Sequence, residues 1–217
     1  MTENEWATCK DIQDMLYVFY YEYRGPIQRK LRLFTCACCR SMWPEFRDSR
    51  LSDALEVAYR FADGLAEVRD LEAAMHDLAI PDDPAIAIDR ITLAVSGCLH
   101  PDIKTSCAMT AYQIANINGP RAAGAEAHRQ CHLIRDIYGP LPFRPVVVEP
   151  KRLSWNHRTV PAIALRIYEE RAFHDLPILA DALEDAGCTD ADLLGHCGGP
   201  GPHVRGCWVV DLLLGRE

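Results

Sequence analysis

The sequence predicts an all-α fold: a multi-helix array of about eight to ten helices, with a Pro-rich connector and at most a minor strand. Apolar residues recur at spacings of three and four, which is typical of amphipathic helices. Capping or helix-stopping residues bound most of these segments. The composition, 49% apolar and 25% charged over 217 residues, is that of a globular protein and excludes disordered, collagen-like and coiled-coil classes.

Helical periodicity dominates the first 138 residues. Met15, Phe19 and Tyr23 lie four apart in a stretch that Gly25-Pro26 ends, and Ser52 is a suitable N-cap. Asp83-Pro84 supplies a cap followed by proline at the first helical position. The helices expected here are 11–24, 28–42, 53–62, 71–78, 84–98, 103–117 and 121–138.

The composition changes after Gly139. Residues 139–161 contain five prolines and the run Val146-Val147-Val148, which predicts an extended connector with one edge strand or none. Further helices are expected over 160–173, 177–187 and 190–196, the last capped by Thr189. The apolar end, 207–214, is expected to dock as a buried helix or strand. We expect a single helical domain, 1–217; the alternative is an N-terminal lobe, 1–138, and a C-terminal lobe, 139–217.

Charge restricts the classes of partner. The formal net charge of -8 argues against a nucleic-acid partner, because the phosphate backbone would be repelled. Residues 24–50 hold seven basic and two acidic side chains, which form either a face for an anionic partner or a helix that packs against acidic neighbours. The acidic first residues lack a signal-peptide pattern, and no apolar run approaches the roughly 20 residues that span a bilayer. We therefore expect a cytoplasmic protein without a membrane segment, while a protein partner stays open.

Cysteine and histidine gather near the end of the chain. Cys197, His203 and Cys207 follow a Cys-x5-His-x3-Cys spacing, with His196 directly before the first cysteine. Zn²⁺ prefers four sulfur, nitrogen or oxygen ligands in a tetrahedron, and the Gly/Pro-rich loop 198–202 could wrap around such an ion. The alternative is two buried cysteines beside surface histidines.

A second group of thiols lies in Cys36-Ala37-Cys38-Cys39. On a helix Cys36 and Cys39 share a face, so they could complete a zinc site with Cys197, His203 or Cys207. These five residues are the predicted metal ligands. A redox pair and an ordinary core role for cysteine are the alternatives.

No catalytic signature is recognisable. His128 and His132 are spaced as in a His-Glu-x-x-His zinc motif, but Arg129 occupies the position of the general base. The sequence also lacks a nucleophile elbow, a Walker loop and a dinucleotide-binding glycine motif.

Several blocks together resemble a paralogous family expanded in planctomycete bacteria. The blocks are Arg29–Arg40, Tyr59–Gly64, Leu133–Gly139, Pro142–Pro145, Arg171–Phe173, Leu176–Cys188 and Gly201–Trp208. The family is functionally uncharacterised, so the resemblance implies no activity and no catalytic residue. It implies only that both cysteine-rich ends belong to one unit.

The favoured hypothesis is therefore a non-enzymatic regulatory or protein-interaction module, stabilised by a structural zinc. The alternative is a metal- or thiol-dependent enzyme with an open zinc position.

Overall fold

The computed structural model describes residues 1–42, 49–78 and 89–216, and these form twelve α-helices and no β-strand. The predicted all-α class is confirmed. None of the helices in these ranges is both long enough and apolar enough to cross a membrane. Contacts between residues group the chain into two compact units, Met1–Cys131 and His132–Glu217. The expected single domain stays a prediction, and each unit is described by itself.

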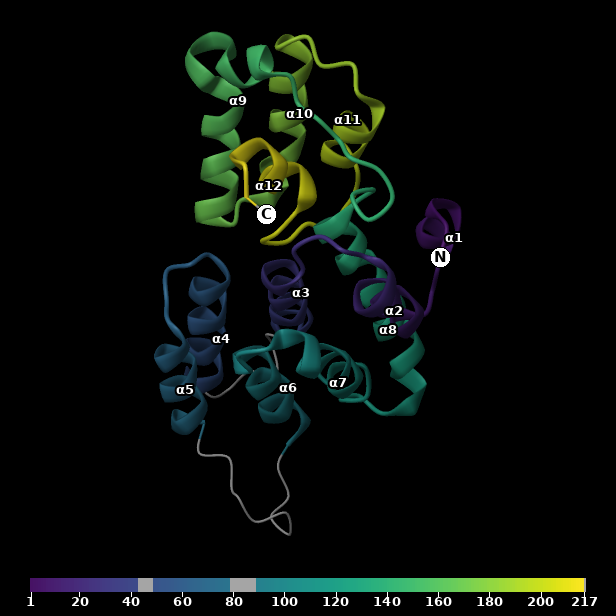
Figure 1. Ribbon diagram of the computed structural model, residues 1–217, viewed down its shortest axis with the longest axis vertical. Coiled ribbons are helices and arrows are strands. Elements are labelled where there is room, and N and C mark those ends of the chain that lie inside the picture. The colour runs from purple at the N-terminus through teal and green to yellow at the C-terminus, as the bar shows by residue number, and fades with distance from the viewer. Residues whose placement is uncertain (43–48, 79–88, 217) are drawn as a thin grey trace. The chain divides into compact units, whose positions relative to one another are not determined.

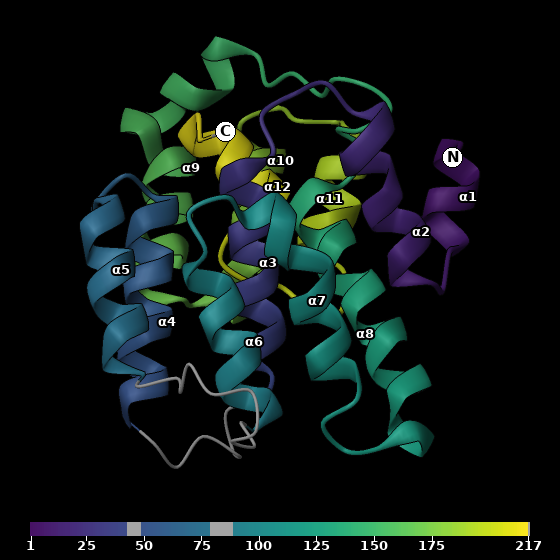
Figure 2. The ribbon, with the colours of Figure 1, turned by 60° about the horizontal axis from the view of Figure 1, so that its bottom comes forward.

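The first unit is built around α3, which packs against α4, α6 and α7. Figures 1 and 2 show these helices around α3, with α5 beside α4. Ten of the thirteen residues of α3 are buried, including its three cysteines. The helices are α1 (Glu3–Thr8), α2 (Ile12–Tyr17), α3 (Gln28–Arg40), α4 (Ser49–Ala62), α5 (Val68–Asp77), α6 (Arg90–Leu99), α7 (Ile103–Ala115) and the first part of α8 (Pro120–Tyr138).

Some helix boundaries and caps of the first unit differ from those expected from the sequence. The segment expected as one helix over 11–24 is α2 followed by a π-helical turn, η1 (Val18–Glu22). Ser52 lies inside α4 and does not cap it, because the helix begins at Ser49. The cap expected at Asp83-Pro84 lies outside the described residues. In the described part, the side chain of Asp89 caps α6 by accepting from the Thr92 amide.

The second unit contains the end of α8 and four further α-helices, and its core lies between α9, α10 and α12. In this unit α9 packs against α10 and α12, and α11 packs against both α10 and α12 (Figure 1). The elements are α9 (Pro150–Glu170), the 3-10 turn η3 (Phe173–Asp175), α10 (Leu176–Asp185), α11 (Ala191–Cys197) and α12 (Trp208–Leu214).

The connector is shorter than expected. No strand forms at Val146–Val148, and α9 begins at Pro150, because proline suits the first position of a helix. The helix is interrupted where Asn156, His157 and Arg158 adopt left-handed backbone angles, just before the expected start at residue 160. At α11, the side chain of Asp190 is the cap in place of Thr189.

Candidate metal centre

A buried carboxylate lies at the end of α8. Asp136 is 3% exposed and sits in the last turn, where the helix dipole favours cations over anions. Burying a charge there is costly unless other groups bind it. Its Oδ2 accepts a hydrogen bond of 2.8 Å from the Val204 amide, and its Oδ1 lies 2.7 Å from Nδ1 of His203. The backbone and a ring therefore fix the orientation of this carboxylate.

Two further side chains point to the same place from neighbouring elements. His196 belongs to the last turn of α11, and Cys207 occupies the N-cap position of α12. The Nε2 atom of His196 lies 3.1 Å from Sγ of Cys207 and 3.1 Å from Oδ1 of Asp136. The loop between the two helices carries His203. Thus α8, α11, the loop and the start of α12 each contribute one side chain.

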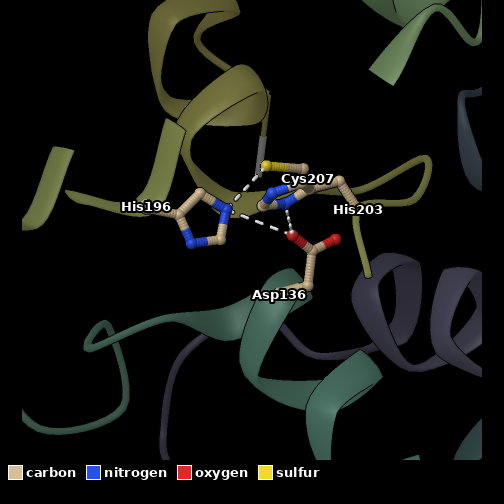
Figure 3. A group of neighbouring side chains, drawn as sticks. All are labelled: Asp136, His196, His203 and Cys207. Carbon is tan, nitrogen blue, oxygen red and sulfur yellow. Dashed lines mark hydrogen bonds and ion pairs between the residues drawn. The ribbon is translucent and has the colours of Figure 1, made fainter. Parts of the chain in front are cut away.

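The four side chains form a group that could hold a metal ion. One ligand atom from each of Asp136, His196, His203 and Cys207 lies within 4.8 Å of the other three, and Figure 3 shows them converging. In tetrahedral zinc, with bonds of about 2.0–2.3 Å, neighbouring ligand atoms lie roughly 3.3–3.6 Å apart. Three pairs of ligand atoms lie 2.7–3.1 Å apart, and every pair lies within 4.8 Å, so modest side-chain shifts would bring all four to zinc distances.

Contacts behind the ligand atoms hold them in place. The Nε2 atom of His203 lies 3.3 Å from the carbonyl oxygen of Gly199, the outer contact that metal-bound histidines commonly make. The backbone amides of Val209 and Val210 form hydrogen bonds to the Cys207 sulfur, which favour a thiolate. Gly201 has a φ of +82°, and a Cβ there would lie 3.2 Å from the His203 ring. The loop backbone is therefore shaped around this ring.

The pKa values of Asp136, His203 and Cys207 all depart from their usual values. Burial would raise the pKa of Asp136, but hydrogen bonds from His196 and His203 and their charges outweigh it and hold that pKa below its usual range. Burial would lower the pKa of His203, and Asp136 reverses this, so that pKa is raised. Burial, with the charge of Asp136, holds the pKa of Cys207 well above its usual value. Coordination to a divalent cation would remove the proton of this thiol.

The arrangement does not match a catalytic Cys-His-Asp triad. In a triad, the nucleophile and the carboxylate contact different nitrogens of the histidine. Here Nε2 of His196 faces both the Cys207 sulfur and the Asp136 carboxylate. Cys207 is also fully buried, with a raised pKa, whereas nucleophilic cysteines are partly exposed thiolates. Four ligand atoms that converge in this way could instead hold a metal ion.

A cleft of about 210 Å³ opens beside the group, and its walls include three of the four side chains, Asp136, His196 and His203. Cys207 does not line it. The side chains of His196 and His203 are 17% and 11% exposed, so an ion could enter from this side.

The predicted ligands are distributed over both units. His203 and Cys207 belong to the group of four. Cys197 is not a member; it is buried in the apolar core of the second unit, and its pKa is raised to about 12 by burial. Cys36 and Cys39 belong to α3 of the first unit, and their joining with the C-terminal ligands stays a prediction. Within the described ranges, His128 and His132 belong to no group of three metal-binding side chains.

Sequence reasoning missed two members of the group. Asp136 carries a signal, because it is an acidic residue among the buried Leu133, Ile137 and Tyr138, where a charge needs partners. For α11, the spacing of four from Leu193 places Cys197 on the buried apolar stripe and turns His196 toward another face. Because adjacent residues of a helix point in different directions, His196 joins the group of four while Cys197 is buried in the apolar core.

Comparisons with known proteins give no relative: no family model, no curated protein and no solved structure matches this chain.

Proposed function

We propose that residues 132–217 form a zinc-stapled helical module and that the protein is a regulatory or protein-interaction module without enzymatic activity. The observation that carries this proposal is the convergence of four buried or half-buried ligand atoms from four separate segments. One ion at this point joins α8, α11, the loop and α12. In small folds such an ion contributes folding free energy directly.

Zinc is the ion that the donor set favours. One thiolate, two imidazoles and one carboxylate are all common zinc ligands, and structural zinc sites have four protein ligands. Calcium and magnesium prefer oxygen donors only. With Asp136 and Cys207 both anionic, a divalent cation makes the site neutral, which suits the burial of those two residues. A closed set of four leaves no position for a catalytic water.

The test is the metal content of the full-length protein purified without chelator. We expect one zinc per chain. Replacement by Co²⁺ should give the strong visible absorption of a tetrahedral site with one thiolate. Removal of zinc by chelator should weaken hydrogen-exchange protection in residues 132–217 while leaving the core of 1–131 protected. Absence of stoichiometric metal, or a loss of protection spread equally over both units, would refute the proposal.

The second candidate function is a zinc enzyme, and the cleft beside the ligands is the observation that favours it. In that case Asp136 would leave the metal, and a water would take the fourth position, as in catalytic zinc sites. X-ray absorption of the zinc-loaded protein distinguishes the two functions. Three protein ligands plus an exchangeable water support the zinc enzyme. One sulfur and three nitrogen or oxygen ligands that do not exchange support the structural zinc site.

We also propose membership of the planctomycete family whose blocks the chain resembles. Three of the four proposed ligands lie within those blocks: Asp136 in Leu133–Gly139, and His203 and Cys207 in Gly201–Trp208. The assignment predicts that other chains with these blocks also carry a histidine at the end of the preceding helix. Chains that keep the blocks but lack these four residues would contradict it.

A further inference from the structure

A buried positive charge lies in the first unit, away from the zinc ligands in the chain. Arg32 on α3 is 1% exposed. Its guanidinium donates to the backbone carbonyls of Cys98, His100 and Pro101 at the end of α6, and it lies 4.7 Å from the Phe61 ring. These partners are dipoles and a π face, and the charge of Asp102 also attracts this guanidinium. Burial still lowers the pKa of Arg32, so a further negative charge beside it would stabilise its charged form.

Three thiols lie beside this charge. Cys36 and Cys39 lie one turn apart on α3, and Cys98 lies on α6, which packs against α3 (Figure 2). The sulfurs of Cys39 and Cys98 are 3.6 Å apart, and Cys36 also forms a thiol hydrogen bond with Cys98. All three are completely buried. We call Cys36, Cys39 and Cys98 the thiol cluster.

The electrostatics single out Cys98 within the thiol cluster. Burial opposes its thiolate, but hydrogen bonds from Cys36, Cys39 and Thr35, with the charge of Arg32, outweigh burial and hold its pKa well below the usual value. Burial, with the hydrogen bond to Cys98, holds the pKa of Cys39 well above its usual value. The geometry independently places a cation beside this thiol, because the Arg32 guanidinium donates to the backbone carbonyl of Cys98 itself.

We propose that the sulfurs of Cys39 and Cys98 bind one soft monovalent cation, Cu(I), between them. Binding replaces the two thiol protons by one Cu⁺ and involves no change of oxidation state. Two thiolates and one Cu⁺ carry a net charge of one minus, which the guanidinium of Arg32 balances. The proposal does not depend on the zinc at the C-terminal group.

The chemistry of the cluster favours this cation over other outcomes. Soft thiolate ligands select Cu(I) among the transition metals. Structural zinc requires four ligands, whereas this cluster offers three thiols, and within the described residues these three are not a group whose ligand atoms all lie close enough to hold one ion. A disulfide would require the sulfurs to approach from 3.6 Å to about 2.05 Å, whereas a bridging cation suits two sulfurs at or beyond their present separation.

The experiment is an anaerobic titration of the full-length, zinc-loaded protein with Cu(I) under reducing conditions, against a chelator that competes for Cu(I). We expect one tightly held copper per chain, seen as a thiolate-to-copper charge-transfer band in the ultraviolet. Cys98→Ala should lower the affinity for copper at least about tenfold and leave the zinc content unchanged. Cys207→Ser should lower the zinc content and leave the copper affinity unchanged.

The matched control is Cys131→Ala, which removes another fully buried thiol of the first unit and should change neither metal. Circular dichroism reports whether each variant folds. Should Cys98→Ala unfold, Cys39→Ala supplies the same test from α3. Equal copper affinity in the wild type and both cluster variants would overturn the proposal.

Discussion

The two units each gather chemically active side chains, but with opposite electrostatics. In the second unit, Asp136 is paired with His203 at 2.7 Å, so an anion lies among imidazoles that can share it. In the first unit, the guanidinium of Arg32 is buried among carbonyls and thiols, and the charge of Asp102 also attracts it. Negative charge on sulfur would therefore be stabilised beside Arg32 in the first unit. A divalent cation would be stabilised beside Asp136 in the second unit.

The two proposed sites differ in the ion that their donor atoms favour. Nitrogen, oxygen and sulfur donors together suit zinc, whereas neighbouring sulfurs alone suit a soft monovalent ion. Counting cysteines cannot separate the two cases, because both clusters are cysteine-containing and buried. The neighbouring charged residue, Asp136 in one unit and Arg32 in the other, distinguishes them.

The sharpest test of the second unit is Asp136→Asn, which keeps the size and the acceptor for the Val204 amide but removes the charge. We expect the zinc affinity to fall by more than about 100-fold, because loss of a ligand should exceed the 10–100-fold cost of losing an outer contact. Competition with a fluorescent zinc chelator measures this. Asp181→Asn, on the exposed face of α10, is the control. Unchanged affinity would remove Asp136 from the metal site.

For the first unit, Arg32→Met removes the buried charge and leaves three carbonyls without their donor. We expect the free energy of unfolding to fall by about 2–4 kcal/mol, measured by urea denaturation in the absence of metal. Arg90→Met, which removes a bond to Gln113 at the surface, should change it by less than about 0.5 kcal/mol. An equally small effect for Arg32 would mean that the buried guanidinium is dispensable for this unit.

A smaller change tests the loop beside the proposed zinc site. Gly201→Ala places a side chain at a left-handed backbone position and against His203, so we expect a loss of about 1–2 kcal/mol and several-fold weaker zinc binding. Gly195→Ala on α11 meets no atom within 4 Å and should be neutral or stabilise the helix by up to about 1 kcal/mol. Similar results for both variants would contradict a role for the loop geometry.

The smallest expected effect concerns the pH dependence of the first unit. Hydrogen bonds from Gln28 and then Thr105 hold the pKa of Asp102, the N-cap of α7, below its usual range. A lowered pKa in the folded state means that the contribution is present above about pH 4 and is lost as pH falls further. Asp102→Ala should therefore cost about 1 kcal/mol at pH 7 and less at pH 3. A pH-independent cost in urea denaturation would contradict this assignment.

The fold class and most helix positions follow from the sequence, because caps and apolar spacing are local signals. The helix expected to begin at residue 103, for example, is α7, which begins at Ile103. The interruption of α9 is not local in this sense, since Asn156, His157 and Arg158 are ordinary residues with left-handed angles. At the metal site, His203 and Cys207 are recognisable from their spacing, whereas Asp136 joins them only through tertiary packing 60 residues or more along the chain.

One close approach sets how the metal site can be assembled. Gly139 follows Asp136 by three residues, and a Cβ on it would lie 2.6 Å from the indole of Trp208, the neighbour of Cys207. The absence of a side chain thus lets the end of α8 lie flat against the ring. Because this contact is apolar and needs no ion, it brings the carboxylate and the sulfur together before any metal arrives. We therefore expect the metal to bind rapidly to a preformed site, with no slow refolding of the chain around the ion.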